Sequence, residues 1–289
     1  GDVYKRQDYT STLIIGANGQ LAKAMQQQYP SARAVGHNDL NLCDAAAIAT
    51  FDWSGIKTII NTAAYTNVDG AETSEGRAAA WRINAQAVGQ LARICSERDI
   101  TLVHVSSDYV FDGETAPHTE DELFSPLSVY GASKAAGDIA ASTTPRHYIV
   151  RTSWVIGDGK NFVTTMLGLA AKNIAPTVVA DQIGCLSFTP EIARAIDYLV
   201  ENKVPYGTYN VTNSGPLVSW ADITRQIFAL AGRDDLPVTD TTTAEYFANK
   251  PGVAPRPLNS DLSLDKLHAT GFISQDWREA LREYVAHAH

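Results

Sequence analysis

The chain has 289 residues, of which 45% are hydrophobic and 19% charged, and its formal net charge is −9 with a pI near 5.2. This length suits one large α/β domain with a smaller second region, and the balanced composition excludes a disordered or fibrous protein. The acidic balance argues against nucleic-acid binding, which needs a basic surface. We find no signal peptide and no apolar run of the roughly 18 residues that a transmembrane helix needs. We therefore expect a cytoplasmic protein that contacts neither nucleic acid nor membrane.

The cysteines and the first residues add little about function. Cys43, Cys95 and Cys185 are far apart and lack the spacing of metal ligands, which predicts free thiols, a reducing compartment and no metal site. Residues 1–9 lack an initiator Met and any hydrophobic periodicity. We set this segment aside as a remnant of expression or of a gene fragment, which leaves open whether the native protein extends upstream.

Strands and helices alternate through the first half of the chain. A short apolar run at 12–15 precedes a glycine-containing turn and a helix-favouring stretch at 20–29, and further strands are predicted at 58–60, 101–105 and 148–150. Apolar residues spaced three or four apart predict one helical face that comprises Ala78, Trp81, Ala85, Val88, Leu91, Ala92 and Cys95. This alternation predicts a parallel sheet with helices on both faces.

The turn after the first strand matches a dinucleotide-binding pattern. Gly16 and Gly19 occupy its first two special positions and Ala22 its third. Glycine lets the backbone turn sharply beside a pyrophosphate, and the following helix offers unpaired N–H groups to that anion. Taken alone, the pattern fits an ordinary strand-to-helix turn equally well.

The adenosine end of such a cofactor is ambiguous in the sequence. Asp39 lies near the spacing of the acidic residue that binds a ribose 2′-OH, whereas Arg33 and His37 are close enough in sequence to meet a 2′-phosphate. NADH and NADPH therefore both remain open. The small residues at 61–64 end the next predicted strand, which fits either a close backbone approach to a ligand or a well-packed strand end.

Three side chains are suited to carbonyl reduction. Tyr130 and Lys134 are four residues apart and share one face of a helix. A cation beside a phenol lowers its pKa from near 10, so that the phenol can protonate a carbonyl oxygen as hydride reaches the carbon. Ser107 ends an apolar strand, where ligands bind in open α/β sheets. Each signal alone fits a surface pair or a turn, but their order along the chain is the one that a nicotinamide-dependent reductase requires.

The second half is less regular than the first. Strands are predicted at 177–179 and 208–211 among helices, and a proline-rich stretch runs from 251 to 257. We therefore predict an α/β fold, a Rossmann-like doubly wound parallel sheet with a smaller C-terminal α/β substrate-binding region. Residues 10–155 would form the dinucleotide-binding domain and residues 156–289 mainly the substrate-binding region, with the chain crossing between the two.

Segments spread from residue 12 to the C-terminus carry a family resemblance, namely 16–21, 61–69, 106–111, 130–134, 151–155, 181–184 and 256–260. The Asp-Tyr-Val-Phe piece at 108–111 and the Arg-Thr-Ser-Trp-Val piece at 151–155 are the most specific. Through them the chain resembles the extended short-chain dehydrogenase/reductases, and within these the dTDP-4-dehydrorhamnose reductase family. The resemblance implies reduction of the C4 keto group of dTDP-4-dehydro-L-rhamnose by NADPH or NADH, in dTDP-rhamnose and cell-surface polysaccharide biosynthesis.

The resemblance also implies residue roles. Tyr130 would donate the proton, Lys134 would bind the nicotinamide ribose and tune Tyr130, and Ser107 would polarise the carbonyl. Together with the turn pattern it gives the expected cofactor contacts, which are Gly16, Gly19, Gln20, Leu21, Asp39, Asn41, Leu42, Ala63, Ala64, Tyr65, Thr66, Tyr130 and Lys134. The expected contacts to a dTDP-linked 4-keto-6-deoxysugar are Ser107, Asp108, Trp154 and Arg256, the last as a guanidinium for the diphosphate.

The chain departs from the family pattern at several positions. Asn41 stands where an Asp is typical, and 185–188 reads Cys-Leu-Ser-Phe where Pro-Thr is usual. Family members that dimerise through magnesium carry a glutamate on the first helix, where this chain has Lys23 and Ala24, and only Glu191 matches a second acidic position. We therefore expect no metal and a monomer or weak homodimer.

Two alternative functions remain open at this point. One is another nucleotide-sugar reductase or an epimerase of the same superfamily. The other is a non-catalytic regulatory subunit, against which the intact Tyr130, Lys134 and Ser107 argue, because such a subunit has no chemical need for them.

Overall fold

A six-stranded parallel sheet forms the centre of the computed structural model, which describes residues 8–288. Its strands lie in the order β10-β5-β4-β3-β1-β2, and every neighbouring pair is parallel. The strands are β1 (Thr12–Ile15), β2 (Arg33–Val35), β3 (Thr58–Asn61), β4 (Thr101–Ser107), β5 (His147–Thr152) and β10 (Gly207–Asn210). The predicted Rossmann-like doubly wound sheet is therefore confirmed.

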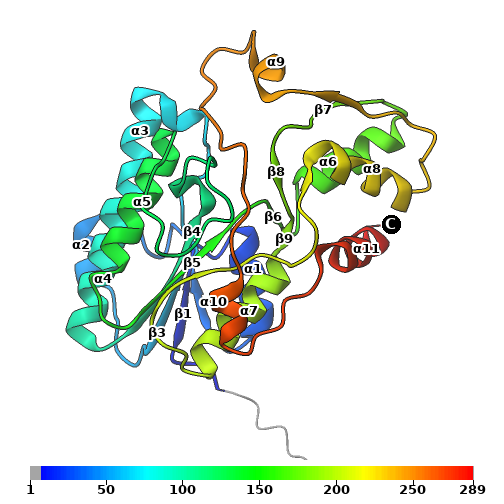
Figure 1. The fold of residues 1–289 in the computed structure, drawn as a ribbon. Helices are drawn as coiled ribbons and strands as arrows, with labels where there is room; N and C mark the ends of the chain where they lie inside the picture. The colour runs from blue at the N-terminus through cyan, green and yellow to red at the C-terminus, as the bar shows by residue number, and fades with distance from the viewer. Residues whose placement is uncertain (1–7, 289) are drawn as a thin grey trace, which may run out of the picture.

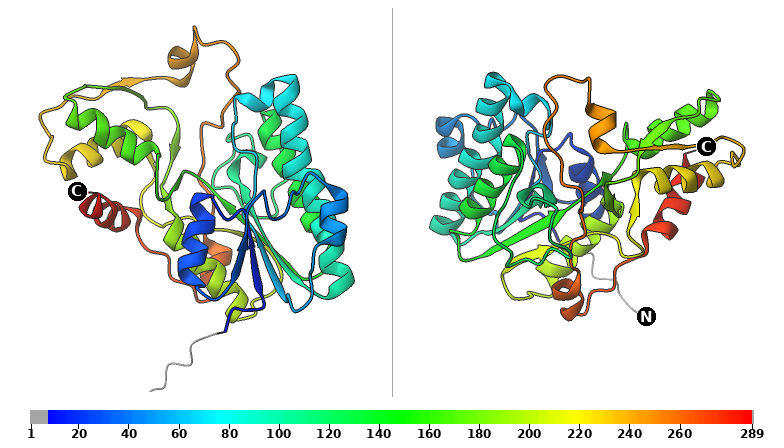
Figure 2. Two further views of the ribbon diagram at one scale, coloured as in Figure 1. Left: turned by 180° about the vertical axis from the view of Figure 1, so that it is seen from behind. Right: turned by 45° about the horizontal axis from the view of Figure 1, so that its top comes forward.

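Helices cover both faces of this sheet (Figures 1 and 2). Helices α1 (Gln20–Gln28) and α7 (Thr189–Glu201) pack against each other on one face. The opposite face carries α2 (Ala45–Thr50), α3 (Ser74–Trp81), the π-helical turn η2 (Arg82–Gln86), α4 (Ala87–Arg98) and α5 (Val129–Ala141). Because strand side chains alternate, Ile14 belongs to the α1–α7 core, whereas Leu13 and Ile15 belong to the α4 core.

The predicted helical face at 78–95 is wrong in its first part. Ala78 and Trp81 are exposed, and the helix buries Gly76 and Ala80 there instead. The cause is the π-helical turn η2, which adds a residue to the turn and shifts which side chains face the sheet. After it, the predicted positions from Val88 onward are buried as expected.

The second lobe has its own apolar core, which includes Met166, Phe228 and Trp277. Its helices are α6 (Phe162–Ala171), α8 (Trp220–Leu230) and α11 (Trp277–His287). Short strand pairs connect them, namely β6 (Val155–Ile156) with β9 (Ser187–Phe188), β7 (Thr177–Val179) with β12 (Thr239–Thr241), and β8 (Ile183–Gly184) with β11 (Val218–Ser219).

The chain passes between the two lobes more than once. Strand β10 and helix α7 come from the second half of the sequence, yet both pack on the central sheet. After α9 (Thr243–Phe247) the segment 248–264 returns from the second lobe to the first, where α10 (Asp265–Ala269) lies beside β10 (Figure 1). The residue boundaries predicted for the two regions stay a prediction, and most of the segment 1–9 lies outside the described residues.

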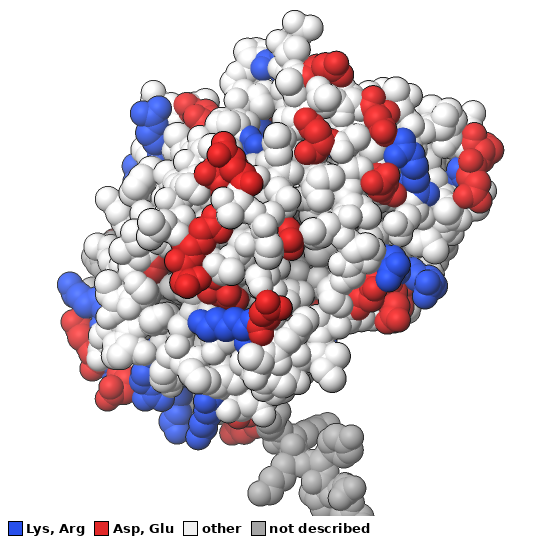
Figure 3. All heavy atoms as spheres, viewed as in Figure 1, with Lys and Arg blue, Asp and Glu red and all other residues white. Residues whose placement is uncertain are grey.

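Two surface properties bear on the partner predictions. Between residues 8 and 288, no helix combines the length and apolarity needed to cross a bilayer. Acidic side chains are spread widely over the face shown in Figure 3, with basic side chains interspersed among them.

Candidate active site

A cavity of about 860 Å³ opens at the carboxyl ends of β1, β3, β4 and β5. The chain leaves β1 toward β2 on one side and continues from β3 toward β4 on the other, so the strand order reverses between β1 and β3. Open α/β sheets bind ligands at such a reversal, because the connecting loops diverge there and leave a crevice. The cavity extends from this point to the second lobe, where Trp154 and Trp220 line it.

The glycine turn lies at the reversal between β1 and β3. Gly16 has a φ of +93°, and a Cβ there would lie 2.8 Å from the Thr62 Oγ1 and 2.9 Å from the Ala63 nitrogen. Only glycine fits this backbone and this close approach. Helix α1 then begins at Gln20 with no side-chain cap on Gly19 and no acidic residue in its first turn. The first turn of α1 is thus suited to an anion such as a pyrophosphate, and these residues fit the cofactor that the turn pattern predicts.

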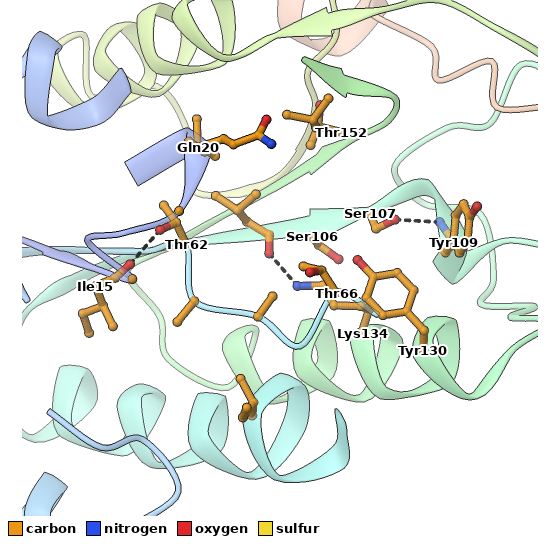
Figure 4. Close-up of a pocket in the computed structure, with 18 of the residues that line it drawn as sticks. Ile15, Gln20, Thr62, Thr66, Ser106, Ser107, Tyr109, Tyr130, Lys134 and Thr152 are labelled. Carbon is orange, nitrogen blue, oxygen red and sulfur yellow. Dashed lines mark hydrogen bonds between the residues drawn. The ribbon is translucent and has the colours of Figure 1, made fainter. Parts of the chain in front are cut away.

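The three candidate catalytic side chains meet in this cavity (Figure 4). Ser107 ends β4, and Tyr130 and Lys134 lie one turn apart on α5, which begins at a Ser128 cap. The Tyr130 hydroxyl points toward the strand end and hydrogen-bonds the Ser107 side chain. The Lys134 Nζ donates to the Val105 carbonyl oxygen at 2.8 Å. The geometry therefore brings a phenol, a hydroxyl and an ammonium to one wall.

The acid–base properties of this wall differ from the sequence-based expectation. Burial raises the pKa of Tyr130 to about 12, and the hydrogen bond with Ser107 offsets only part of that rise. Burial also lowers the pKa of Lys134 to about 8, with Asp138 acting in the opposite direction. The predicted lowering of the Tyr130 pKa by Lys134 is wrong for this state of the protein. A raised pKa keeps the phenol protonated at neutral pH, which is the form that a proton donor needs.

A buried polar network lies beside α5, the helix that carries Tyr130 and Lys134. Asp138 lies one turn beyond Lys134, and its Oδ2 accepts a 2.9 Å hydrogen bond from the Arg151 Nε. The His104 Nε2 lies 3.9 Å from the other carboxylate oxygen, and the Asn61 amide donates to the His104 Nδ1 at 3.2 Å. Burial holds the pKa of His104 well below its ordinary value, so the imidazole is neutral. Asp138 and Arg151 therefore form the charged pair of this network.

Unpaired polar groups line the end of the cavity nearest the second lobe. Asp108 is almost fully buried, and this burial raises its pKa to about 6, while the Ser260 and Ser107 hydroxyls act to lower it. The Thr152 and Ser153 hydroxyls line the cavity, are buried, and find no hydrogen-bond partner among the described residues. Buried hydroxyls without partners are costly, which indicates a ligand with its own hydroxyl or keto groups.

Most of the predicted site residues line this one cavity. They are Gly16, Gly19, Gln20, Leu21, Leu42, Ala63, Ala64, Thr66, Ser107, Asp108, Tyr130, Lys134 and Trp154. Four others do not line it, namely Asp39, Asn41, Tyr65 and Arg256.

Asp39 and Asn41 instead stabilise the loop that follows β2. The Asp39 Oδ2 accepts a hydrogen bond from the Gly36 N–H at 2.9 Å, and the Asn41 Oδ1 accepts one from the Cys43 N–H at 2.9 Å. His37 lines the cavity, whereas the Arg33 guanidinium stacks on the Phe51 ring. In this structure Asp39 therefore serves the turn and does not face the ligand space.

Arg256 is paired with a carboxylate away from the cavity lining. Its guanidinium binds both oxygens of Asp69, at 2.8 and 3.1 Å, and Asp69 also accepts the Ala254 N–H. The predicted role of Arg256 at a diphosphate therefore requires exchange of this partner. The structure instead gives Arg256 the role of attaching the segment 248–264 to the loop after β3.

Two side chains that the sequence analysis missed shape the site. Asn84, in the π-helical turn η2, donates to the Tyr65 carbonyl oxygen and to the Ser133 Oγ, and its Oδ1 accepts the Tyr65 N–H. It thereby fixes the loop after β3 to α5. Trp220 lines the cavity and stacks on Trp154. In the sequence, Asn84 differs from its neighbours only as a polar residue within a predicted helix. The Ser219 cap indicates that a helix begins at Trp220, but no sequence pattern indicates that Trp220 lines the cavity.

Glu191, the one acidic residue matching the magnesium-linked dimers, is already paired. It is buried and forms a salt bridge with Arg194, and it also accepts the Gln275 N–H at 3.3 Å. Within residues 8–288, no group of three or more His, Cys, Asp or Glu side chains is arranged to hold a metal ion.

The chain is similar over nearly its whole length to known proteins of one family. Residues 10–289 match the family model described as the RmlD substrate binding domain. A dTDP-4-dehydrorhamnose reductase from Aggregatibacter actinomycetemcomitans is 36% identical, over 96% of this chain and 98% of that protein. The crystal structure of a dTDP-4-dehydrorhamnose reductase from Clostridium acetobutylicum superposes with a TM-score of 0.88 at 36% identity, covering 96% of this chain and 99% of that one.

A further solved relative was determined with a cofactor. The dTDP-4-dehydrorhamnose reductase from Bacillus anthracis, in complex with NADP, superposes with a TM-score of 0.87 at 32% identity and covers 96% of this chain and 97% of that one. Identity above 30% over nearly the whole of each chain accompanies a shared fold. This protein therefore belongs to the RmlD substrate-binding-domain family.

Proposed function

We propose that this protein reduces the C4 keto group of dTDP-4-dehydro-L-rhamnose to give dTDP-L-rhamnose, with NADPH as the reductant. The observation that carries this proposal is the convergence of Ser107, Tyr130 and Lys134 in the cavity that starts at the Gly16 turn. A carbonyl reductase needs these groups together, and the chain is 36% identical to a protein named for that reaction. A role in dTDP-rhamnose and polysaccharide biosynthesis follows from the product.

The protein's own groups act on the carbonyl oxygen. The turn at Gly16 and Gly19 and the start of α1 would hold NADPH, which would supply a hydride for the carbonyl carbon. The Ser107 hydroxyl donates a hydrogen bond to the C4 oxygen, and the Tyr130 phenol delivers its proton to the same oxygen as negative charge develops there. Lys134 lies one helical turn from Tyr130 on the same wall, where its ammonium would hold the ribose hydroxyls of the nicotinamide. The walls of the cavity limit the access of water to this proton transfer.

The loop after β2 supports NADPH over NADH. A carboxylate that faces the adenosine ribose would repel a 2′-phosphate, but Asp39 is turned to the Gly36 N–H and does not line the cavity. His37 lines that end instead. We therefore expect a lower KM for NADPH than for NADH.

The test is a reduction assay with purified protein and dTDP-4-dehydro-L-rhamnose, run with each cofactor. We expect nicotinamide oxidation equal in amount to the dTDP-L-rhamnose formed. Tyr130→Phe should reduce kcat by about 10²–10⁴-fold, the usual contribution of a general acid, and leave NADPH binding unchanged. An absence of turnover with both cofactors would refute the proposal.

The same assay separates the alternatives. An epimerase regenerates its nicotinamide in each cycle, so it would convert the sugar without stoichiometric NADPH consumption. A reductase for a different 4-keto-6-deoxysugar would consume NADPH only with that sugar. A cytoplasmic location and a monomeric or weakly dimeric state remain predictions.

A further inference from the structure

Trp154 adopts a strained backbone conformation beside the catalytic wall. Its φ is +48°, in the left-handed region, which is unfavourable for a residue that carries a side chain. Such a conformation persists only where the surrounding structure holds it, and it is concentrated at functional sites. Trp154 lies two residues after the end of β5, and it lines the cavity.

Two neighbours hold the Trp154 indole in place. Trp220 stacks on it with 3.8 Å between ring centroids and 21° between the ring planes. Gly184 lies against the same indole, since a Cβ on Gly184 would come within 3.0 Å of the Trp154 Cε2 and Cζ2 atoms. Strand pairing connects the two neighbours, because Val218, two residues before Trp220, pairs with Gly184 across β11 and β8.

Trp220 is itself fixed by a chain of hydrogen bonds. Its Nε1 donates to the Gln182 Oε1 at 3.2 Å, and the Gln182 Nε2 donates to the Thr243 Oγ1 at 3.2 Å. The Thr243 hydroxyl donates in turn to the Asp181 Oδ1 at 2.7 Å. Phe162 packs against the Trp220 ring with 4.5 Å between centroids. Trp220 therefore has a defined orientation before any substrate binds.

We infer that Trp220 is a positioning residue: it holds the Trp154 indole, the sugar contact that the resemblance predicts, against the apolar surface of the deoxysugar. The inference rests on the proposed function. Indole rings pack well against C–H and methyl groups, whereas a sugar hydroxyl placed against them would lose hydrogen bonds to water. The polar groups of the sugar would instead meet the unpaired Thr152 and Ser153 hydroxyls and Asp108, which line the same end of the cavity.

The test compares the affinities of dTDP and dTDP-L-rhamnose, both measured by calorimetry in the presence of NADP⁺. The ratio of the two Kd values isolates the contribution of the sugar. In Trp220→Ala we expect this ratio to fall by about ten-fold, the value of an aromatic contact, with the Kd of NADP⁺ unchanged. Trp220→Phe, which restores a ring, should recover much of the ratio.

A second variant moves the Trp154 indole without removing Trp154 or Trp220. Gly184→Ala adds a methyl group that displaces the Trp154 indole, so it should also lower the ratio. Its matched control is Gly168→Ala on α6, where a Cβ meets nothing within 4 Å and the ratio should stay at the wild-type value. Circular dichroism provides a structural readout, because two stacked indoles give a paired exciton signal that Trp220→Ala and Trp220→Phe should both lose.

The outcomes separate this inference from the proposed function. A wild-type ratio near one, together with no turnover, would overturn both. A wild-type protein that turns over substrate and prefers dTDP-L-rhamnose, beside a Trp220→Ala variant that keeps the full ratio, would overturn this inference alone.

Discussion

Replacing Asp108 with asparagine should make the free protein more stable and less active. Asp108 is almost fully buried at the cavity wall, and burial raises the pKa of its carboxyl from 3.8 to about 6. The folded state therefore favours the neutral carboxyl, so the contribution of Asp108 to the stability of the protein is greatest below the unfolded pKa. That contribution is lost as the pH rises from 3.8 toward about 6, and the loss is complete above that value.

The magnitude follows from the size of the shift. One pKa unit corresponds to about 1.4 kcal/mol, so a rise of about two units makes the charged carboxylate cost about 3 kcal/mol at neutral pH. Asparagine has nearly the same shape and never ionises. We expect Asp108→Asn to raise the free energy of unfolding by up to about 3 kcal/mol at about pH 7.5, and by about half of that at about pH 5.

Urea unfolding of both proteins at the two pH values measures this difference. Asp234→Asn provides the control, because Asp234 is exposed and its replacement should change stability by less than about 0.5 kcal/mol at either pH. Because Asp108 lines the cavity at the predicted sugar end, the KM for the keto-sugar should rise in the same variant. A variant that is less stable than the wild type, or a difference that does not change with pH, would refute the reasoning.

Three other changes test separate parts of the structure. Gly16→Ala should weaken NADPH binding at least ten-fold in a fluorescence titration, because its methyl group would meet Thr62 and Ala63. The control is Gly159→Ala: Gly159 has a similar φ of +92°, but an added Cβ would meet nothing within 4 Å, so this variant should bind NADPH normally. Arg151→Met should lower the free energy of unfolding by about 3–5 kcal/mol, because it leaves the buried Asp138 carboxylate unpaired. Adding Asp138→Asn in a double-mutant cycle should restore much of that loss. Losses that simply add would contradict the pairing. Asp69→Asn should accelerate limited proteolysis within residues 248–257. The free energy of unfolding should change by about 1 kcal/mol or less, because the ion pair between Asp69 and Arg256 is partly exposed. An unchanged cleavage rate would show that Arg256 does not hold this segment.

The sequence alone predicted the fold class and most of the candidate residues that the structure brings together in one cavity. Apolar runs of strand length, alternating with helical stretches, specify a parallel sheet. The glycine turn predicts a ligand site at the carboxyl end of its first strand. Ser107, Tyr130 and Lys134 could be selected in advance because a strand end and a helical spacing of four constrain where side chains point. These signals are local, so they can be read from the chain without its tertiary contacts.

Only the tertiary structure decided which neighbours each of these side chains has. The rise in the pKa of Tyr130 comes from burial, which depends on segments that pack against α5, such as the one that carries Tyr109. The pairing of Arg256 with Asp69 joins residues far apart in the sequence, and no local pattern indicates that this guanidinium is already bound. The stack of Trp154 on Trp220 likewise depends on how β8 pairs with β11. Burial and long-range pairing arise from the packing of whole elements, and for that reason they were absent from the sequence patterns.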